Sequence, residues 1–276
     1  MNLRAKNQNK SIIFDPTITT KNDLTKCFCI FTDPTRTSKT PAQRRVTPGT
    51  EIRHPTMKVH TDGACINNGK QNAQSSSKIW FGPNNPRNNA IRIPGSAQSN
   101  QAGKIVAVIS ALTLTPNFYP LEVISDSKYT IEGLTTHLKH WEDIGWIQIK
   151  NAKLFQRVAY LLRQRTAKTT FKWVKGHQGN LGNKESNKLA KEGANKDQPD
   201  QLNLHVPDKF FMQGAKLSAL KQATAYQRIR KAKAASDPPI AAKQTDQIRA
   251  AIENYSGECE TNETIWTSLR EPVLQT

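Results

Sequence analysis

Hydrophobic and polar positions follow regular periods in the middle of the chain and no continuous period in its flanks. Alternating apolar and polar residues predict β-strands, and apolar residues three and four positions apart predict helices. The alternating runs predict five strands, at residues 57–61, 78–81, 90–93, 121–125 and 169–174. The helical spacing predicts helices that begin at Ser99, at Ser127, near Leu154 and at Gly182. Three strands in a meander, followed by strands that alternate with helices, predict an α/β domain.

The flanks of this pattern are polar and basic. Residues 1–56 carry one short apolar stripe, Leu24, Phe28 and Phe31, which predicts a short helix. Beyond the domain, the polar composition of residues 196–206 predicts a linker, and two helices are predicted after it, from Ala215 to Ala232 and around Ile248 to Tyr255. The predicted organisation is an N-terminal extension (1–56), a central domain (57–195) and a basic, partly helical C-terminal extension (196–276).

The charge of the chain points to a polyanionic partner. There are 40 Lys and Arg against 22 Asp and Glu, a formal net charge of +18. Nucleic acid and an anionic membrane both attract such a chain. The N-terminus has no apolar signal core and no run has the length of a membrane span, which favours nucleic acid, no membrane, and an intracellular location, nuclear or cytoplasmic. The cations of residues 221–233 form either a second phosphate-binding surface or a solvated helix face.

Two aspartates each follow directly after a predicted strand. Asp62 ends the first strand and is followed by Gly63, which favours a sharp turn, and Asp126 ends the fourth. If these strands are neighbours in the sheet, the carboxylates converge, and converging oxygen ligands suit Mg²⁺. Two such ions promote phosphodiester cleavage by activating water and stabilising the leaving oxygen. The competing interpretation is a pair of unrelated turns.

Four segments with a fixed order surround these residues. They are Thr61–Cys65 (TDGAC), Ser125–Tyr129 (SDSKY), Trp173–Asn180 (WVKGHQGN) and Gly182–Ala190 (GNKESNKLA). Together they closely resemble the type-1 ribonuclease H family over residues 58–195. The flanks are similar to those of fungal retroelement reading frames that carry such a domain.

The resemblance implies a ribonuclease H-like fold, with a five-stranded mixed sheet in the order 3-2-1-4-5 flanked by helices. It also implies Mg²⁺-dependent cleavage, with Mn²⁺ as a substitute, of the RNA strand of an RNA–DNA hybrid. The residues that match the family's catalytic positions are Asp62 and Asp126, which are also its metal ligands, and the loop histidine His177.

The chain departs from the family at two of the four carboxylates that this resemblance implies. Lys104 stands where the helix glutamate is expected, and Asn187 where the last aspartate is expected. Unit charges about 4 Å apart interact by about 4 kcal/mol at an effective dielectric constant near 20. Lys104 therefore removes an attraction for the metal and adds a repulsion, unless its flexible stem carries the ammonium away. Weakened metal binding and impaired cleavage are expected.

Residues that match nucleic-acid contacts of the family are present. Asn68, Asn100 and Gln101 match positions that contact the minor groove, so the resemblance implies such contacts here. Residues 139–153 match a basic protrusion of the family, which we call the handle. Its matching nucleic-acid contacts are Trp141, Trp146 and Lys150. For Trp141, inward packing is an equally good interpretation. Two functions stay open: an impaired hybrid endoribonuclease, or a non-catalytic pseudoenzyme, a retroelement remnant, that binds RNA–DNA hybrid or double-stranded RNA.

Overall fold

The computed structural model of the chain describes residues 11–14, 29–31, 54–96, 98–176, 193, 196–207, 210, 214–236 and 240–256. The predicted positions His177 and Asn187 lie outside the described residues, as does the predicted helix from Gly182 apart from Gly193. The chain divides into two units, Met1–Ala219 and Leu220–Thr276, and each is described by itself.

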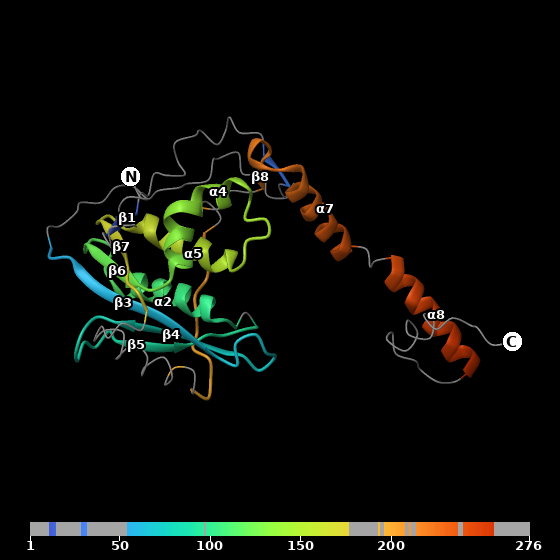
Figure 1. Ribbon diagram of the computed structural model, residues 1–276, viewed down its shortest axis with the longest axis horizontal. Helices are drawn as coiled ribbons and strands as arrows, with labels where there is room; N and C mark the ends of the chain where they lie inside the picture. The colour runs from blue at the N-terminus through green and yellow to red at the C-terminus, as the bar shows by residue number, and fades with distance from the viewer. Residues whose placement is uncertain are drawn as a thin grey trace. The chain divides into compact units, whose positions relative to one another are not determined.

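A mixed sheet forms the centre of the first unit (Figure 1). Its strands are β1 (Ile12–Ile13), β3 (Met57–Ile66), β4 (Gln74–Trp80), β5 (Asn89–Arg92), β6 (Leu121–Ser125) and β7 (Thr169–Trp173), in the order β1-β7-β6-β3-β4-β5. β3, β4 and β5 pair antiparallel, while β6 pairs parallel with both β3 and β7. The predicted order of the five strands of the central domain is therefore confirmed.

The sixth strand comes from the N-terminal extension. Ile12 pairs antiparallel with Phe171 of β7, and the side chains of Ile12 and Phe14 join the hydrophobic core. The prediction of five strands was therefore one strand short. Ile12 and Ile13 are too few residues to show the alternating pattern of a strand. They form one only by pairing with the edge of β7.

The first strand of the central domain is longer than predicted, and Asp62-Gly63 is not a turn. Both residues lie inside β3, where Gly63 pairs with Ser77 of β4. Glycine is required here because of a close approach: a Cβ at Gly63 would lie 2.3 Å from the backbone nitrogen of Lys104. The matching glycine on the helix, Gly103, would meet the Ser76 carbonyl at 2.5 Å. The two glycines let helix and sheet touch through their backbones.

The helix that makes this contact is α2 (Asn100–Leu114), as the apolar spacing predicted. The Ser99 hydroxyl caps it by accepting a hydrogen bond from Ala102 N–H, and the apolar face of the helix is buried against the sheet. The second predicted helix is three pieces: α3 (Lys128–Glu132), a π-helical turn (Gly133–His137) and α4 (Leu138–Asp143). The third is α5 (Ala152–Gln164).

The segment after the central domain packs against it, so the prediction of a linker at 196–206 was wrong. Asp200 accepts a hydrogen bond from the Arg92 backbone N–H of β5 at 2.7 Å. Further on, the Arg157 guanidinium of α5 donates to the His205 carbonyl, and Val206 is buried. The polar composition of the segment did not indicate this packing, because its hydrogen bonds, and the packing of Leu202 and Leu204 on the core, involve distant parts of the chain.

Both extensions also meet in a two-stranded sheet. β2 (Cys29–Ile30) pairs antiparallel with β8 (Ala215–Lys216), which a short 3₁₀ turn (Leu217–Ala219) follows. This pairing corrects two predictions. Residues 29–30, at the end of the helix predicted to contain Phe31, form a strand, and so do residues 215–216, at the start of the helix predicted from Ala215. Very short strands of this kind depend on a distant partner and leave no local pattern.

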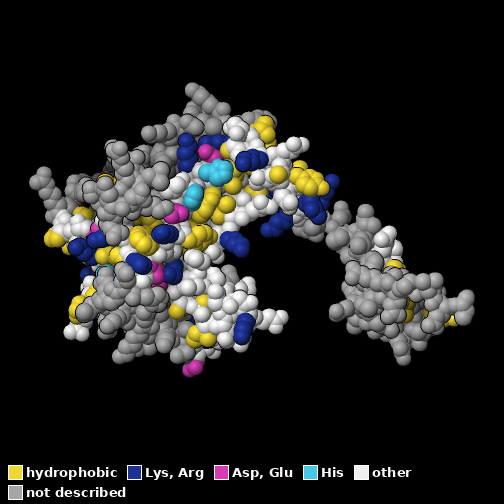
Figure 2. Space-filling view, in the orientation of Figure 1, with side chains coloured by type: hydrophobic (Ala, Val, Ile, Leu, Met, Phe, Trp, Pro, Cys, Tyr) yellow, Lys and Arg dark blue, Asp and Glu magenta, His cyan; other side chains and the backbone are white. Residues whose placement is uncertain are grey.

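The described residues of the second unit form two helices, α7 (Gln222–Ser236) and α8 (Ile240–Ser256). Lys and Arg side chains lie on the visible surface of α7 beside hydrophobic ones (Figure 2). Arg228, Arg230, Lys231 and Lys233 are all exposed. Among the described helices of the whole chain, none combines the length and apolar character that a membrane span needs.

Candidate active site and nucleic-acid interface

The parallel pairing of β3 and β6 brings the two predicted metal ligands together. Thr61 lies opposite Ser125 at the last paired position, so Asp62 and Asp126 each follow one residue later. Their side chains are only 12% and 16% exposed. The convergence predicted from two strand ends is therefore present in the structure, although Asp62 itself continues in β3 beside β4.

The ammonium of Lys104 lies between these two carboxylates. Its Nζ donates to Asp126 Oδ1 at 2.6 Å and lies 3.4 Å from Asp62 Oδ1. The Lys104 side chain is 13% exposed, so its stem does not carry the charge out to water. We call Asp62, Lys104 and Asp126 the carboxylate centre.

Backbone and aromatic groups fix the two aspartates. Asp62 Oδ1 accepts a hydrogen bond from the Gly63 N–H at 2.8 Å, and the Trp173 indole donates to the Asp126 carbonyl at 3.0 Å. Gly176 lies so close that a Cβ on it would be 3.0 Å from Asp126 Oδ2. The chain thus passes beside Asp126 immediately before the position of His177.

Electrostatics at the centre are dominated by burial. Burial raises the pKa of the Asp62 carboxyl above its ordinary value. The Lys104 ammonium and the Gly63 N–H oppose this rise, whereas Asp126 adds to it, and the net shift of the pKa is upward. A like charge and a low-dielectric setting both disfavour the ionised carboxyl, which is why Lys104 is needed close by.

As arranged, the centre does not fit a magnesium ion. Its two carboxylates already share a cation at hydrogen-bonding distance, and Mg²⁺ needs free oxygen ligands. Across the part of the chain that the structure describes, no three His, Cys, Asp or Glu side chains come together as a metal-binding group. The position of Asn187 lies outside that part.

The two acidic side chains of the handle form ion pairs with buried bases from other elements of the domain. Glu142 makes a two-point ion pair with Arg163 of α5, at 2.8 and 3.0 Å, and Asp143 pairs with Lys216 of β8 at 2.6 Å. Both bases are buried, at 5% and 6% side-chain exposure. The contribution of Lys216 could not be found from sequence, because its partner lies far away in the chain.

Internal pairing of the acids leaves the outer surface of the handle positive. Figure 2 shows histidine side chains on the surface over α4. The exposed basic side chains of the handle are Lys139, His140, Lys150 and Lys153. A surface with several cations and internally paired acids suits a phosphate backbone.

The tryptophans of the handle pack inward. The Trp141 ring lies 4.9 Å from Phe155 in an edge-on contact and 5.6 Å from His137 in a stacked one. Trp146 lies 6.1 Å from Trp141 and has a left-handed backbone, with φ of 59°. Both are partly buried against the hydrophobic core, so the inward-packing interpretation describes Trp141 better than an outward stacking platform does.

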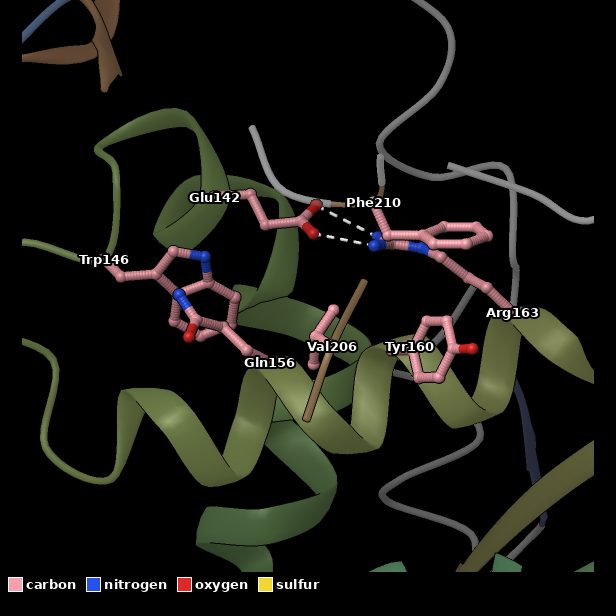
Figure 3. A pocket seen from close by; sticks show the side chains of 7 residues that line it. All are labelled: Glu142, Trp146, Gln156, Tyr160, Arg163, Val206 and Phe210. Carbon is pink, nitrogen blue, oxygen red and sulfur yellow. Dashed lines mark hydrogen bonds and ion pairs between the residues drawn. The ribbon is translucent and has the colours of Figure 1, made fainter. Parts of the chain in front are cut away.

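A small cavity beneath the handle is too small for a ligand (Figure 3). Its volume is about 20 Å³, enough for about one water molecule. Figure 3 shows Glu142 and Arg163 pointing toward each other across it, so its charged groups satisfy one another. The cavity is lined by Glu142, Trp146, Gln156, Tyr160, Arg163, Val206 and Phe210.

The three predicted minor-groove residues are exposed. Asn68 lies in the turn between β3 and β4, and Asn100 and Gln101 form the first turn of α2. Ser75, which follows the β3–β4 turn, donates to the Ser99 carbonyl at 2.7 Å and so joins the two regions. An open depression of about 330 Å³ beside this turn is lined by polar residues that include Lys70, Arg92 and Gln98.

The topology of the sheet, with paired carboxylates where β3 and β6 meet, defines a ribonuclease H fold. The family model for RNase H matches residues 54–195, slightly more than half of the chain. The chain belongs to the RNase H family.

Several curated proteins are similar to this chain. Ribonuclease H1 of Rattus norvegicus and of Homo sapiens are each 34% identical over 141 residues, which is 49% of this chain and 49% of each relative. Ribonuclease H of Zymomonas mobilis is 31% identical over 159 residues, which is 53% of this chain and 94% of that relative. The chain thus spans about half the length of the mammalian relatives it matches.

Solved structures with a similar fold include LC9-RNase H1, described as a type 1 RNase H with the type 2 active-site motif. It is 20% identical, with a TM-score of 0.40, over 64% of this chain and 87% of that one. The foamy virus protease–reverse transcriptase is 24% identical, with a TM-score of 0.42, over 53% of this chain and 22% of that one.

Proposed function

We propose that this chain binds RNA–DNA hybrids through its RNase H domain and that its cleavage of the RNA strand is impaired. The observation that carries the impairment is the position of Lys104, whose ammonium bridges Asp62 and Asp126 at 3.4 and 2.6 Å. Family membership supports the nucleic-acid class of the substrate.

Binding is supported by surfaces that do not depend on the carboxylate centre. The handle presents cations to the phosphate backbone, while Asn68, Asn100 and Gln101 present amides of the kind that contact 2′-hydroxyls and base edges in a minor groove. The excess of Lys and Arg over Asp and Glu adds a long-range attraction for any polyanion.

In this family, cleavage requires a metal ion, and the carboxylate centre with Lys104 in place does not provide free oxygen ligands for one. Bound Mg²⁺ would supply an activated water and stabilise the leaving oxygen of the RNA strand. Asp62 and Asp126 would hold it, and His177 would assist proton transfer or product release, the role that the resemblance to the family implies. With the ammonium in place, the two aspartates pair with Lys104 instead of a metal ion.

A second candidate function is slow Mg²⁺- or Mn²⁺-dependent cleavage of the hybrid. It is favoured by the two carboxylates themselves, which lie together at the junction of β3 and β6. In this case a divalent ion competes with Lys104 for the same oxygens, so high metal concentration favours activity.

One experiment separates these functions. A labelled RNA–DNA hybrid is incubated with the protein in EDTA, in Mg²⁺ and in Mn²⁺, with double-stranded RNA and duplex DNA as competitors. We expect binding that weakens steeply between low and physiological salt, because phosphate contacts release counterions, and little or no RNA-strand cleavage. A hybrid affinity that does not change with salt concentration would contradict the proposed interface. Rapid cleavage in Mg²⁺ would contradict the proposed impairment.

A further inference from the structure

The fold itself places Lys104 in the carboxylate centre. Gly63 and Gly103 allow α2 and β3 to approach so closely that the Lys104 backbone nitrogen lies directly above Gly63. The lysine stem therefore starts beside Asp62, and its ammonium lies between the carboxylates. The Lys104 side chain is only 13% exposed, so its ammonium is held against the two carboxylates and does not extend into solvent.

We infer that Lys104 is a resident cation of the RNase H domain, which replaces a divalent ion between Asp62 and Asp126 and makes the folded domain independent of Mg²⁺. This inference rests on the proposed function only for the view that these aspartates are metal-binding positions. Without a cation, the buried carboxylate of Asp62 and the partly buried carboxylate of Asp126 would repel each other after losing much of their hydration, and the ammonium relieves both costs.

A divalent ion can enter this centre only if the ammonium leaves it. The ion would gain two carboxylates, and the protein would lose the 2.6 Å hydrogen bond to Asp126 and the 3.4 Å contact to Asp62. The displaced ammonium would have to reach water from an enclosed position or remain near the ion and repel it. Exchange of a resident lysine for Mg²⁺ is therefore unfavourable.

The test is the effect of Mg²⁺ on thermal unfolding of the full chain without nucleic acid. The unfolding temperature is measured in EDTA with NaCl and in MgCl₂ at the same ionic strength, for the wild type, Lys104→Glu and Lys104→Met. We expect no Mg²⁺-specific shift for the wild type. For Lys104→Glu we expect a rise of several degrees, since an ion that binds only the folded state stabilises it. Lys104→Met should show a smaller rise.

A matched control is Lys168→Glu, which makes the same charge change on an exposed lysine. Lys168 lies immediately before β7, and its carbonyl accepts a hydrogen bond from the Leu121 N–H, at the opposite end of β6 from Asp126. It should behave like the wild type. Lys104→Met also keeps the test valid if the glutamate variant does not fold.

Three results decide the matter. A Mg²⁺-specific shift in both Lys104 variants but not in the wild type or control supports a resident cation. An equal shift in the wild type would overturn it, and so would the lack of any shift in the Lys104 variants, because the centre would then exclude Mg²⁺ without help from Lys104. Failure of the wild type to bind a hybrid would reject the proposed function and leave these thermal results unchanged.

Discussion

The carboxylate centre and the handle neutralise their acidic side chains in different ways. At the centre, two carboxylates share one lysine, so one negative charge is left over in an enclosed place. In the handle, Glu142 and Asp143 each have a base of their own, Arg163 and Lys216. The acids of the handle are thus paired with buried bases from α5 and β8, and the lysines of the handle are exposed.

This difference separates chemistry from binding. A centre that has an internal cation in contact with its carboxylates is poorly suited to recruit a metal ion. A handle whose acids are hidden in ion pairs presents only positive charge to a phosphate backbone. Under the proposed function, cleavage is impaired at the carboxylate centre, and the handle takes part in binding. Changes that reverse either arrangement test the comparison.

The largest effect is expected where the charge of the centre is restored. Lys104→Glu together with Asn187→Asp removes the resident ammonium and returns two negative charges. We expect Mg²⁺-dependent cleavage of the RNA strand to rise by roughly 100-fold or more, about 3 kcal/mol in the barrier. Lys104→Glu alone should recover more than Asn187→Asp alone, since it reverses a charge, and neither should match the double variant.

The measurement is single-turnover cleavage of a labelled hybrid by the wild type, both single variants and the double variant. A wild type as fast as the double variant would show that the centre is not impaired. If the double variant binds hybrid and stays inactive, the defect lies outside these two positions.

A smaller effect, on stability, is expected inside the handle. Trp141→Ala removes a ring that contacts Phe155, His137 and Trp146. We expect the free energy of unfolding to fall by about 2–4 kcal/mol. This is less than for a fully buried aromatic side chain, because the Trp141 ring is only partly buried. Chemical denaturation measures the change. A loss of hybrid affinity with unchanged stability would instead make Trp141 a direct nucleic-acid contact.

The smallest effect is expected on the outer surface of the handle. Lys150→Ala should weaken hybrid binding a few-fold and reduce the slope of log affinity against log salt by about 1, as for one lost phosphate contact. Stability should not change, because Lys150 is exposed. Lys168→Ala is the control for loss of one positive charge elsewhere. An equal effect of both variants would mean that only net charge matters and that the handle makes no specific contact.

The sequence by itself determined much of this domain. Local periods located five strands of the sheet and the helices that begin near Ser99, Ser127 and Leu154, and the Ser99 cap marked the start of α2. The motifs around Asp62 and Asp126 indicated neighbouring strands, which the parallel pairing confirms. The resemblance to the family also showed that Lys104 occupies the position where a metal-binding glutamate is expected. Such features are encoded within a few residues of each other, where spacing and turn chemistry act directly.

Only the tertiary structure decided how distant residues use one another. Gly63 suggested a turn, yet it serves a helix contact, because what matters is the backbone of Gly103 and Lys104 above it. The destination of the Lys104 ammonium, the pairing of Asp143 with Lys216 and the joining of Ile12 to Phe171 likewise depend on chain segments far apart. Spacing along the chain carries no information about such contacts, since flexible stems and short strands acquire their partners only when the chain has folded.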